Sequence, residues 1–209
     1  MCFTEWITLI KDLILSGAAI TASFVAVKGL GTWKAKLRGE SEYELSKRIL
    51  VTLEKYRDAI NGVRNPAIWV HETPLPPENK AKGMTSEDIR FYGVSTVYQT
   101  RWEQVQIERS SMYADILEAE VIWEDEFKGL FNGVFELQHN LFISVRQHLE
   151  CMNPDTSQGT KDAIREIQKK SENILYSTLS IDDPDQFTQD LTSAIKKIEI
   201  FLKPKLKYK

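Results

Sequence analysis

The sequence predicts an all-α protein with one N-terminal transmembrane helix followed by an elongated antiparallel helical bundle. Three observations predict this class. Residues 13–27 carry no charged side chain, apolar residues further along recur at three- and four-residue steps, and no segment alternates with period two over a useful length. A chain of 209 residues, 42% hydrophobic and 27% charged, can bury one ordinary core, so we expect one domain plus an appendage.

The first element is an apolar run from Trp6 to Leu30 that is long enough to cross a bilayer. Its 25 residues would form a helix of roughly 37 Å, against a hydrocarbon core of ~30 Å. Lys11 and Asp12 interrupt the run near one end, where the two charges can partly neutralise each other. A buried helix of a soluble bundle is the alternative for so apolar a run. The side chains expected at the membrane interface are Trp6, Lys28, Trp33, Lys34, Lys36 and Arg38.

The charges around this run predict its orientation. Basic residues follow the run, whereas Glu5 precedes it, which is the reverse of a cleaved signal peptide. Retention of basic residues on the cytoplasmic side would place the N-terminus outside and the rest of the chain in the cytoplasm. We therefore divide the chain into a transmembrane anchor with its juxtamembrane segment, residues 1–39, and a cytoplasmic helical bundle, residues 40–209. The small side chains expected to let anchors associate recur every four residues: Ala18, Ala22 and Ala26.

The second element is an amphipathic helix of about two dozen residues. Ser41 and Glu44 have the spacing of a capping box and predict that this helix begins there. It would end before a proline-rich loop at residues 64–84. Thr85 and Asp88 would then open a rod of about 37 residues, whose apolar positions hold one stripe.

Three further helices complete the expected body. Acidic residues 124–126 predict a break and the first turn of a helix that runs towards Cys151. After the turn at 153–159, a shorter helix would contain Ile164, Ile167, Ile174 and Leu175. The sequence "DDPDQF" would cap the last helix, with Pro184 in its first turn.

Four stretches of the chain carry a resemblance: "GLGTWKAKLRGESEYELSKRILVTLEKYRDAINGVRNP" (29–66), "RWEQVQ" (101–106), "LEAEVIW" (117–123) and "FLKPKLK" (201–207). In these stretches, which run along most of its length, the chain resembles a group of uncharacterised bacterial single-pass membrane proteins. The resemblance implies an N-terminal anchor in a bacterial inner membrane, followed by a cytoplasmic helical body. It implies no activity, so no catalytic residue is carried over.

Composition and motifs offer little support for catalysis, metal binding or nucleic-acid binding. Beyond residue 40 the chain holds 22 basic and 27 acidic residues, which argues against phosphate-rich partners. Glu136 and His139 make only half of a bundle-core metal site. We interpret His139 and His148 as histidines that pack within the bundle rather than bind a metal. Cys2 and Cys151 show neither ligand spacing nor a disulfide framework. We expect no enzyme activity, no cofactor and no bound metal.

Charged residues beside the apolar stripe at 45–63 are the candidate interaction residues. At ~100° per residue, Arg57 and Arg64 fall on one shoulder of the stripe and Arg48 falls on the other. The acidic partners expected on a neighbouring helix are Glu118 and Glu120, in pairs we expect to form within one chain.

Arg109 interrupts an otherwise apolar stripe. A buried guanidinium needs a carboxylate, so Arg109 either pairs in the core or lies where the stripe is exposed to a partner.

The expected function is a membrane-anchored interaction, scaffold or sensor protein. Its partners would be the lipid bilayer and an unidentified protein, with a second copy of the chain as one candidate. The alternative is a membrane effector, of the pore-forming or membrane-perturbing kind found in bacterial defence, that acts by assembly of its transmembrane helices. A third hypothesis, a helical enzyme, has Glu136 and His139 as its only candidate residues.

Overall fold

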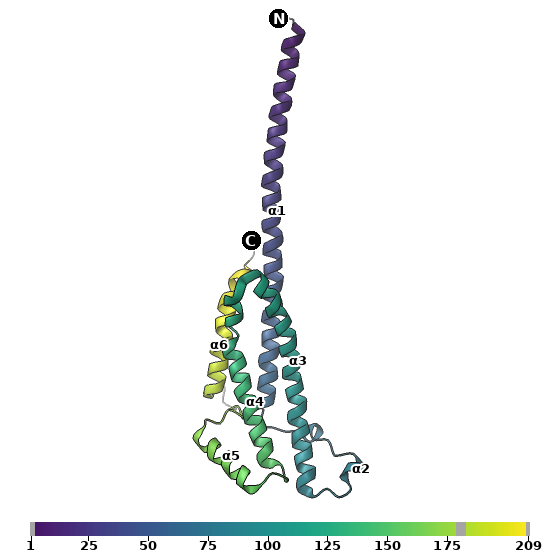
Figure 1. Cartoon of the computed structure of the whole chain (residues 1–209), viewed down its shortest axis with the longest axis vertical. Coiled ribbons are helices and arrows are strands. Elements are labelled where there is room, and N and C mark those ends of the chain that lie inside the picture. Colours follow the sequence, from purple (N-terminus) through teal and green to yellow (C-terminus); the bar gives the residue numbers. More distant parts are fainter. Residues whose placement is uncertain (1–2, 179–182, 208–209) are drawn as a thin grey trace.

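The computed structural model describes residues 3–178 and 183–207, and within them all of the regular secondary structure is helical. The side chains of residues 3–6, 8–10, 12 and 124–126 lie outside this description. The helices are α1 (Phe3–Arg64), α2 (Glu78–Ala81), α3 (Ser86–Gly129), α4 (Asn132–Met152), α5 (Gln158–Lys170) and α6 (Gln186–Leu202). Two short 3-10 helices, η1 (Val70–Glu72) and η2 (Lys203–Leu206), complete the elements (Figure 1). The all-α class is confirmed.

Helix α1 is a single helix of 62 residues that projects far beyond the other helices (Figure 1). It passes Ser41 without a break, so the predicted helix start there is wrong. The flanking sequence is rich in Lys, Leu, Arg and Glu, which favour helix over a cap. An ion pair between Arg38 Nε and Glu42 Oε1, at 3.0 Å and four residues apart, also spans Ser41 within the helix.

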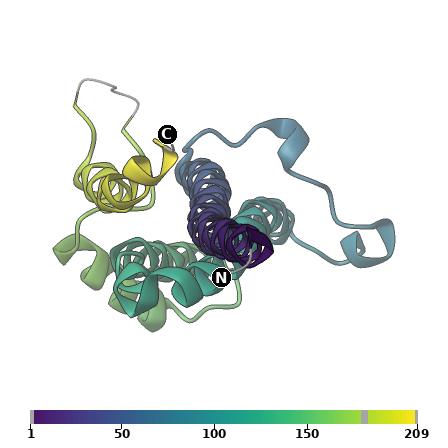
Figure 2. The same cartoon turned by 90° about the horizontal axis from the view of Figure 1, so that it is seen from above.

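The rest of the molecule, residues 42–207, forms a body in which α1, α3, α4 and α6 lie side by side (Figures 1 and 2). Successive long helices alternate in direction, so that α6 ends close to the place where α1 leaves the body (Figure 1). The predicted apolar stripes supply one shared core. Its members include Leu45, Ile49, Leu53, Ile60, Val105, Met112, Ile116, Val134, Leu141, Leu191, Ile195 and Ile198.

The body is also joined by polar contacts across its core. The hydroxyl of Tyr56 donates a hydrogen bond to Gln138 Oε1 at 2.5 Å, and both side chains are buried. A buried hydroxyl needs such a partner, because an unsatisfied one costs about 1–3 kcal/mol. The contact therefore fixes the register between α1 and α4.

Helix ends agree with the sequence at one place and differ at three others. Thr85 and Asp88 form the predicted capping box at the start of α3, with Asp88 N–H donating to Thr85 Oγ1 at 3.2 Å. The predicted break at residues 124–126 is wrong, because α3 continues to Gly129. Buried Phe127 and Phe131 pack edge to face on either side of the actual turn, at 5.3 Å between ring centroids. Tertiary packing of these rings, rather than local acidic charge, decides where the helix ends.

The last two predicted boundaries also shift. Helix α5 ends at Lys170, so Ile174 and Leu175 belong to a non-helical segment, where Leu175 is buried. Asp185 is the N-cap of α6, which places Pro184 before the helix rather than in its first turn. The proline-rich segment after Arg64 is the predicted connection, and it contains only α2 and η1.

We expect a chain that begins at residue 40 to fold as a soluble, highly helical body. The core starts at Leu45, so this truncation removes none of its side chains. Ser41 and Glu44 would then lie at a new helix N-terminus and could form the capping box that the full chain does not use. Far-ultraviolet circular dichroism, compared with the full chain in detergent, is the measurement. A spectrum of mostly coil would contradict the prediction.

Candidate membrane-spanning segment and charged contacts

The projecting part of α1 is apolar and uncovered by the body. One 18-residue window within Leu13–Arg64 has a mean hydropathy of 1.8, and none of the window is buried. Large apolar side chains point outward on all sides of the helix: Leu13, Ile14, Leu15, Ile20, Phe24, Val25, Val27 and Leu30. Burying one such side chain is worth about 1.5–3 kcal/mol, so this surface is costly in water. By length and composition, the helix can span a membrane.

The polar groups of this segment bond within the helix. Thr21 Oγ1 and Ser23 Oγ each donate to the carbonyl oxygen four residues earlier, at 2.8 Å, and Thr32 Oγ1 does so at 3.0 Å. Such bonds satisfy hydroxyls where water is absent. The segment thus leaves few polar groups that would need solvent.

The residues predicted to lie at the membrane interface, and those predicted to let anchors associate, all lie on α1. Trp33 and the basic residues Lys28, Lys34, Lys36 and Arg38 are exposed between the apolar window and the body. The side chain of Trp6 lies outside the described residues. The small side chains of the association stripe are all exposed: Ala18, Ala22 and Ala26.

Arg48 makes the predicted contact between helices. Its Nε lies 2.6 Å from Asp115 Oδ1, and its Nη2 also pairs with Glu118. The interpretation of an intramolecular pair is confirmed for Arg48 and Glu118. Sequence reasoning missed Asp115, a buried acid between the apolar positions Met112 and Ala119 of α3. An acidic residue within that apolar stripe was the feature of the sequence from which this contact could have been predicted.

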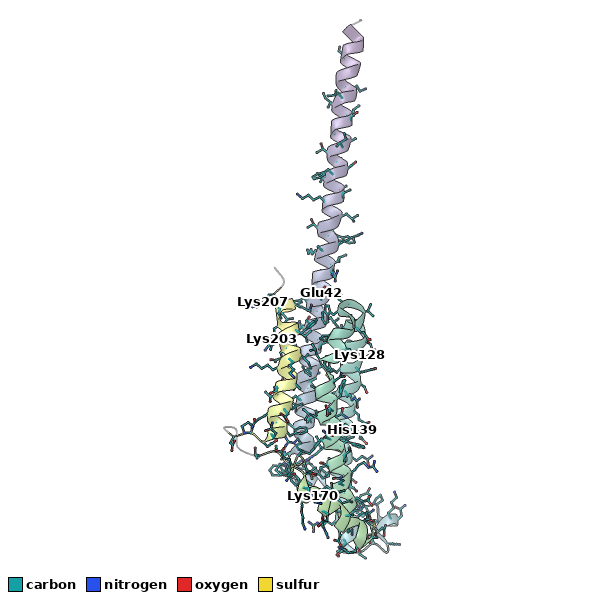
Figure 3. The ribbon with its side chains drawn as sticks, turned by 60° about the vertical axis from the view of Figure 1, so that its left-hand side comes forward. Glu42, Lys128, His139, Lys170, Lys203 and Lys207 are labelled. Atoms are coloured by element: carbon teal, nitrogen blue, oxygen red, sulfur yellow. The ribbon has the colours of Figure 1, made fainter. Side chains whose placement is uncertain are left out.

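The remaining predicted charges do not link helices in the same way. Arg57 pairs with Glu54 three residues before it, and Glu120 Oε1 pairs with Lys128 Nζ at 3.1 Å within α3 (Figure 3). Arg109 is exposed, and its guanidinium lies 4.9 Å from the centroid of the Phe135 ring. Arg109 is thus exposed between the buried stripe positions Val105 and Met112, and its contact with a partner stays a prediction.

Arg64 departs most from its expected position. Rather than flanking the stripe at the surface, its side chain is fully buried at the C-terminal end of α1. Its Nε donates to the carbonyl oxygen of Ile174, and its Nη1 donates to Thr188 Oγ1, both at 2.8 Å. Its Nη2 donates to Asp185 Oδ1 at 2.8 Å and to the carbonyl oxygen of Tyr176 at 3.2 Å. The guanidinium also lies 4.3 Å from the centroid of the Phe187 ring.

Asp185 completes this buried contact as an ionised acid. Burial acts to raise the pKa of Asp185, but hydrogen bonds from the Thr188 N–H and the Arg64 guanidinium outweigh it and lower the pKa to about 2. Because the same carboxylate caps α6, the ion pair ties the end of α1 to the start of α6. The sequence signal was the acidic cap itself, which the prediction used for helix α6 alone.

Arg101 organises the proline-rich segment, and sequence reasoning did not single it out. Its Nη2 lies 3.1 and 3.0 Å from the two carboxylate oxygens of Glu72. The same side chain donates to the carbonyl oxygens of Asn65 at 2.8 Å and Ala67 at 2.7 Å. A hydrogen bond from the Trp69 N–H, together with Arg101, lowers the pKa of Glu72. The guanidinium thus holds the start of the segment against α3.

The histidines give no sign of a metal centre in the described part of the chain. Glu136 and His139 are both exposed on α4, so the interpretation of His139 as a bundle histidine is wrong (Figure 3). No group of three or more potential metal ligands occurs among the described residues. His148 is half-buried between the rings of Tyr98 and Tyr176, at centroid distances of 5.7 and 6.1 Å. Burial lowers its pKa.

His148 also lines a cavity of about 620 Å³ between α4, α5 and residues 171–176. The lining mixes amides such as Gln147 and Asn173 with apolar side chains such as Ile143 and Leu175. Beside His148, the lining contains a single carboxylate, that of Glu172. The cavity therefore indicates no particular ligand chemistry.

Breaking the buried ion pair is expected to destabilise the body strongly. Arg64→Leu leaves Asp185 without its cation, and removal of one partner of a buried pair costs about 3–5 kcal/mol. Arg57→Leu removes an exposed pair within one helix and should cost less than about 1 kcal/mol. Thermal unfolding of both variants in detergent provides the measurement. Equal stability of the two variants would contradict the assigned role of Arg64.

The pH dependence of stability should also report Asp185. Its pKa is about 2 in the folded protein and 3.8 ordinarily, so its contribution is complete above about pH 4 and is lost as the pH falls towards 2. The shift corresponds to about 2 kcal/mol. Asp185→Asn should therefore lose less stability than the wild type between pH 5 and pH 2.5, whereas the exposed control Asp190→Asn should follow the wild type. Parallel acid-unfolding curves for all three proteins would refute the assignment.

Comparison with known proteins assigns no family to the chain. No protein-family model, curated protein or solved structure matches it. The resemblance to bacterial single-pass membrane proteins stays a prediction, and a function has to be inferred from the residues and contacts described above.

Proposed function

We propose that the chain is a membrane-anchored interaction protein, of the scaffold or sensor kind, without catalytic activity of its own. Residues 1–39 would form the anchor, and the body, as an elongated antiparallel bundle, would hold or sense a protein partner. The observation that carries the proposal is the apolar window of α1, of which no part is buried. A core helix of a soluble protein would be covered by other helices, and this one is not.

The surface of the body favours a protein partner over a nucleic-acid partner. Several of its ion pairs link different segments of the chain, as those of Arg48, Arg64 and Arg101 do. Helix α3 presents exposed apolar side chains away from the core: Ile107, Tyr113, Leu117 and Val121. Exposed apolar side chains of this kind suit a protein contact, whereas an acidic body does not suit phosphates.

The proposed orientation has the N-terminus outside a bacterial inner membrane and the body in the cytoplasm. The basic side chains between the apolar window and the body support it, because cells retain such clusters on the cytoplasmic side. Glu5 on the other flank is consistent with that asymmetry.

A second candidate function is that of a membrane effector that perturbs the bilayer when anchors assemble. It is favoured by the exposure of Ala18, Ala22 and Ala26, which no part of the described chain covers. Overexpression separates the two proposals. Growth arrest with dye entry that disappears in an Ala22→Leu variant would favour the effector, and normal growth would favour the interaction protein.

We expect the chain to fractionate with membranes and to resist extraction by 1 M salt, a condition in which charges are screened within about 3 Å. Burial of the apolar window in lipid does not depend on ionic attraction, so only detergent should release the protein. The matched control is the chain beginning at residue 40, which should be soluble. Full-length protein in the soluble fraction after mild lysis would overturn the proposal.

We also expect single cysteines to report opposite sides of the membrane. Cys2 lies before the apolar window and outside the described residues, whereas Ser110 is an exposed position on α3. A membrane-impermeant thiol reagent on intact spheroplasts should modify Cys2 in a Cys151→Ser chain. It should spare the cysteine of a Cys2→Ser, Cys151→Ser, Ser110→Cys chain until the membrane is opened. The reverse labelling would show that the body lies outside the cytoplasm.

A further inference from the structure

Helix α3 carries an exposed, uncharged seam on the side opposite the core. Its positions recur at alternating steps of three and four residues, which is the a/d spacing of a coiled coil. The large side chains are exposed by 60% at Ile107, 45% at Leu117 and 87% at Val121. On the same turns of α3, Met112 and Ile116 are buried in the body. We call this set of exposed positions the α3 seam: Ile107, Ser110, Ala114, Leu117 and Val121.

The α3 seam is short and has acidic residues at both ends. The preceding position of the same spacing is Glu103, and the next position after Val121 is Glu124. The 15 residues from Ile107 to Val121 correspond to about 21 Å of helix. Two heptads are fewer than the three to four that identify an independent coiled coil. The seam therefore needs a second tether before it can hold a partner helix.

The α3 seam is neutral, although the body is acidic. Beyond residue 40 the chain has 22 basic and 27 acidic residues, so two bodies repel each other on average. Glu118 and Glu120 flank the seam, and each is neutralised within its own chain. Glu118 pairs with Arg48, and Glu120 pairs with Lys128. The seam is thus a face on which an identical body can approach with little repulsion, and it offers no counter-charge that would attract a charged partner.

The proposed anchor supplies both the second tether and the orientation. Helix α3 lies alongside α1 in the body, so α3 would run in the same direction in every anchored copy (Figure 1). A twofold axis along the membrane normal then brings identical seam positions opposite each other, as in a parallel coiled coil. The small side chains of Ser110 and Ala114 leave room for the two helices to approach. Confinement to one membrane raises the effective concentration of the second copy.

We infer that the α3 seam is the face on which a second copy of this chain docks, in parallel, when both copies are anchored in one membrane. This inference rests on the proposed function and names its protein partner. The attraction comes from burial of Ile107, Leu117 and Val121 against their counterparts, which removes apolar surface from water.

The test is disulfide crosslinking of the full chain, reconstituted into vesicles in a Cys2→Ser, Cys151→Ser background. Parallel docking places Ala114 opposite its counterpart, so Ala114→Cys chains should be oxidised to dimers. His139→Cys, at an exposed position of α4, is the control for random collisions (Figure 3). We expect at least fivefold more dimer from Ala114→Cys than from His139→Cys. The excess should persist at 0.5 M salt, because an apolar contact is not weakened by screening of charges.

A matched pair of substitutions identifies the seam as the contact. In the Ala114→Cys chain, Val121→Glu would place two carboxylates opposite each other and should reduce the dimer at least fivefold. Val51→Glu changes an exposed valine of α1 that lies outside the seam, and it should leave the dimer unchanged. Circular dichroism checks that both bodies remain folded, as expected for changes at exposed positions. An equal effect of the two substitutions would overturn the inference.

The failures of the two proposals are distinguishable. A chain that floats with the vesicles but forms no more dimer through Ala114→Cys than through His139→Cys overturns the docking of a second copy and leaves the anchor standing. A chain that does not float overturns the proposed function and the inference together.

Discussion

The structure depends on one buried cation. Arg64 is fully buried at the end of α1, where removal from water would be prohibitive without acceptors on every side. Its partners come from a non-helical segment at Ile174 and Tyr176 and from the first turn of α6 at Asp185 and Thr188. The guanidinium therefore specifies the path of a segment that has little regular structure of its own. It also sets where α6 begins, and thus brings the far end of α6 back to α1.

The sequence was sufficient to predict the helices but not the contacts that hold them together. Apolar stripes such as Leu45–Val63 persist over many turns, so their period reveals both the helix and its buried face. The capping box at Thr85 was equally readable because its partner is three residues away. The prediction placed Arg64 at the edge of the apolar stripe, because a helical wheel shows only the position of a residue around the helix. It does not show the segment, more than a hundred residues distant in the sequence, that covers this side chain. The predicted helix start at Ser41 was wrong for a related reason. A capping residue begins a helix only where the helix does not continue through it, and the residues around Ser41 favour continuation.

Helix α1 has two different environments along its length. Within the body, most of its apolar residues lie on the side that packs against the other helices, although Val51 is exposed together with Glu44 and Lys47. In the projecting part, apolar side chains occur all round, as a helix surrounded by lipid requires. Because the core begins only at Leu45, the apolar window contributes no side chain to it. Folding of the body and the proposed membrane insertion thus depend on separate stretches of the same helix.

The continuity of α1 also determines which way the body faces. An α-helix turns by about 100° and advances about 1.5 Å with each residue. With no loop between Leu30 and Leu45, the number of residues there fixes the rotation of the body about the axis of α1 relative to the faces of the apolar window. Adding one residue would swing the body through more than a quarter of a circle while barely changing its height. Under the proposed association of anchors through Ala18, Ala22 and Ala26, the same rotation would decide which faces of the two bodies meet.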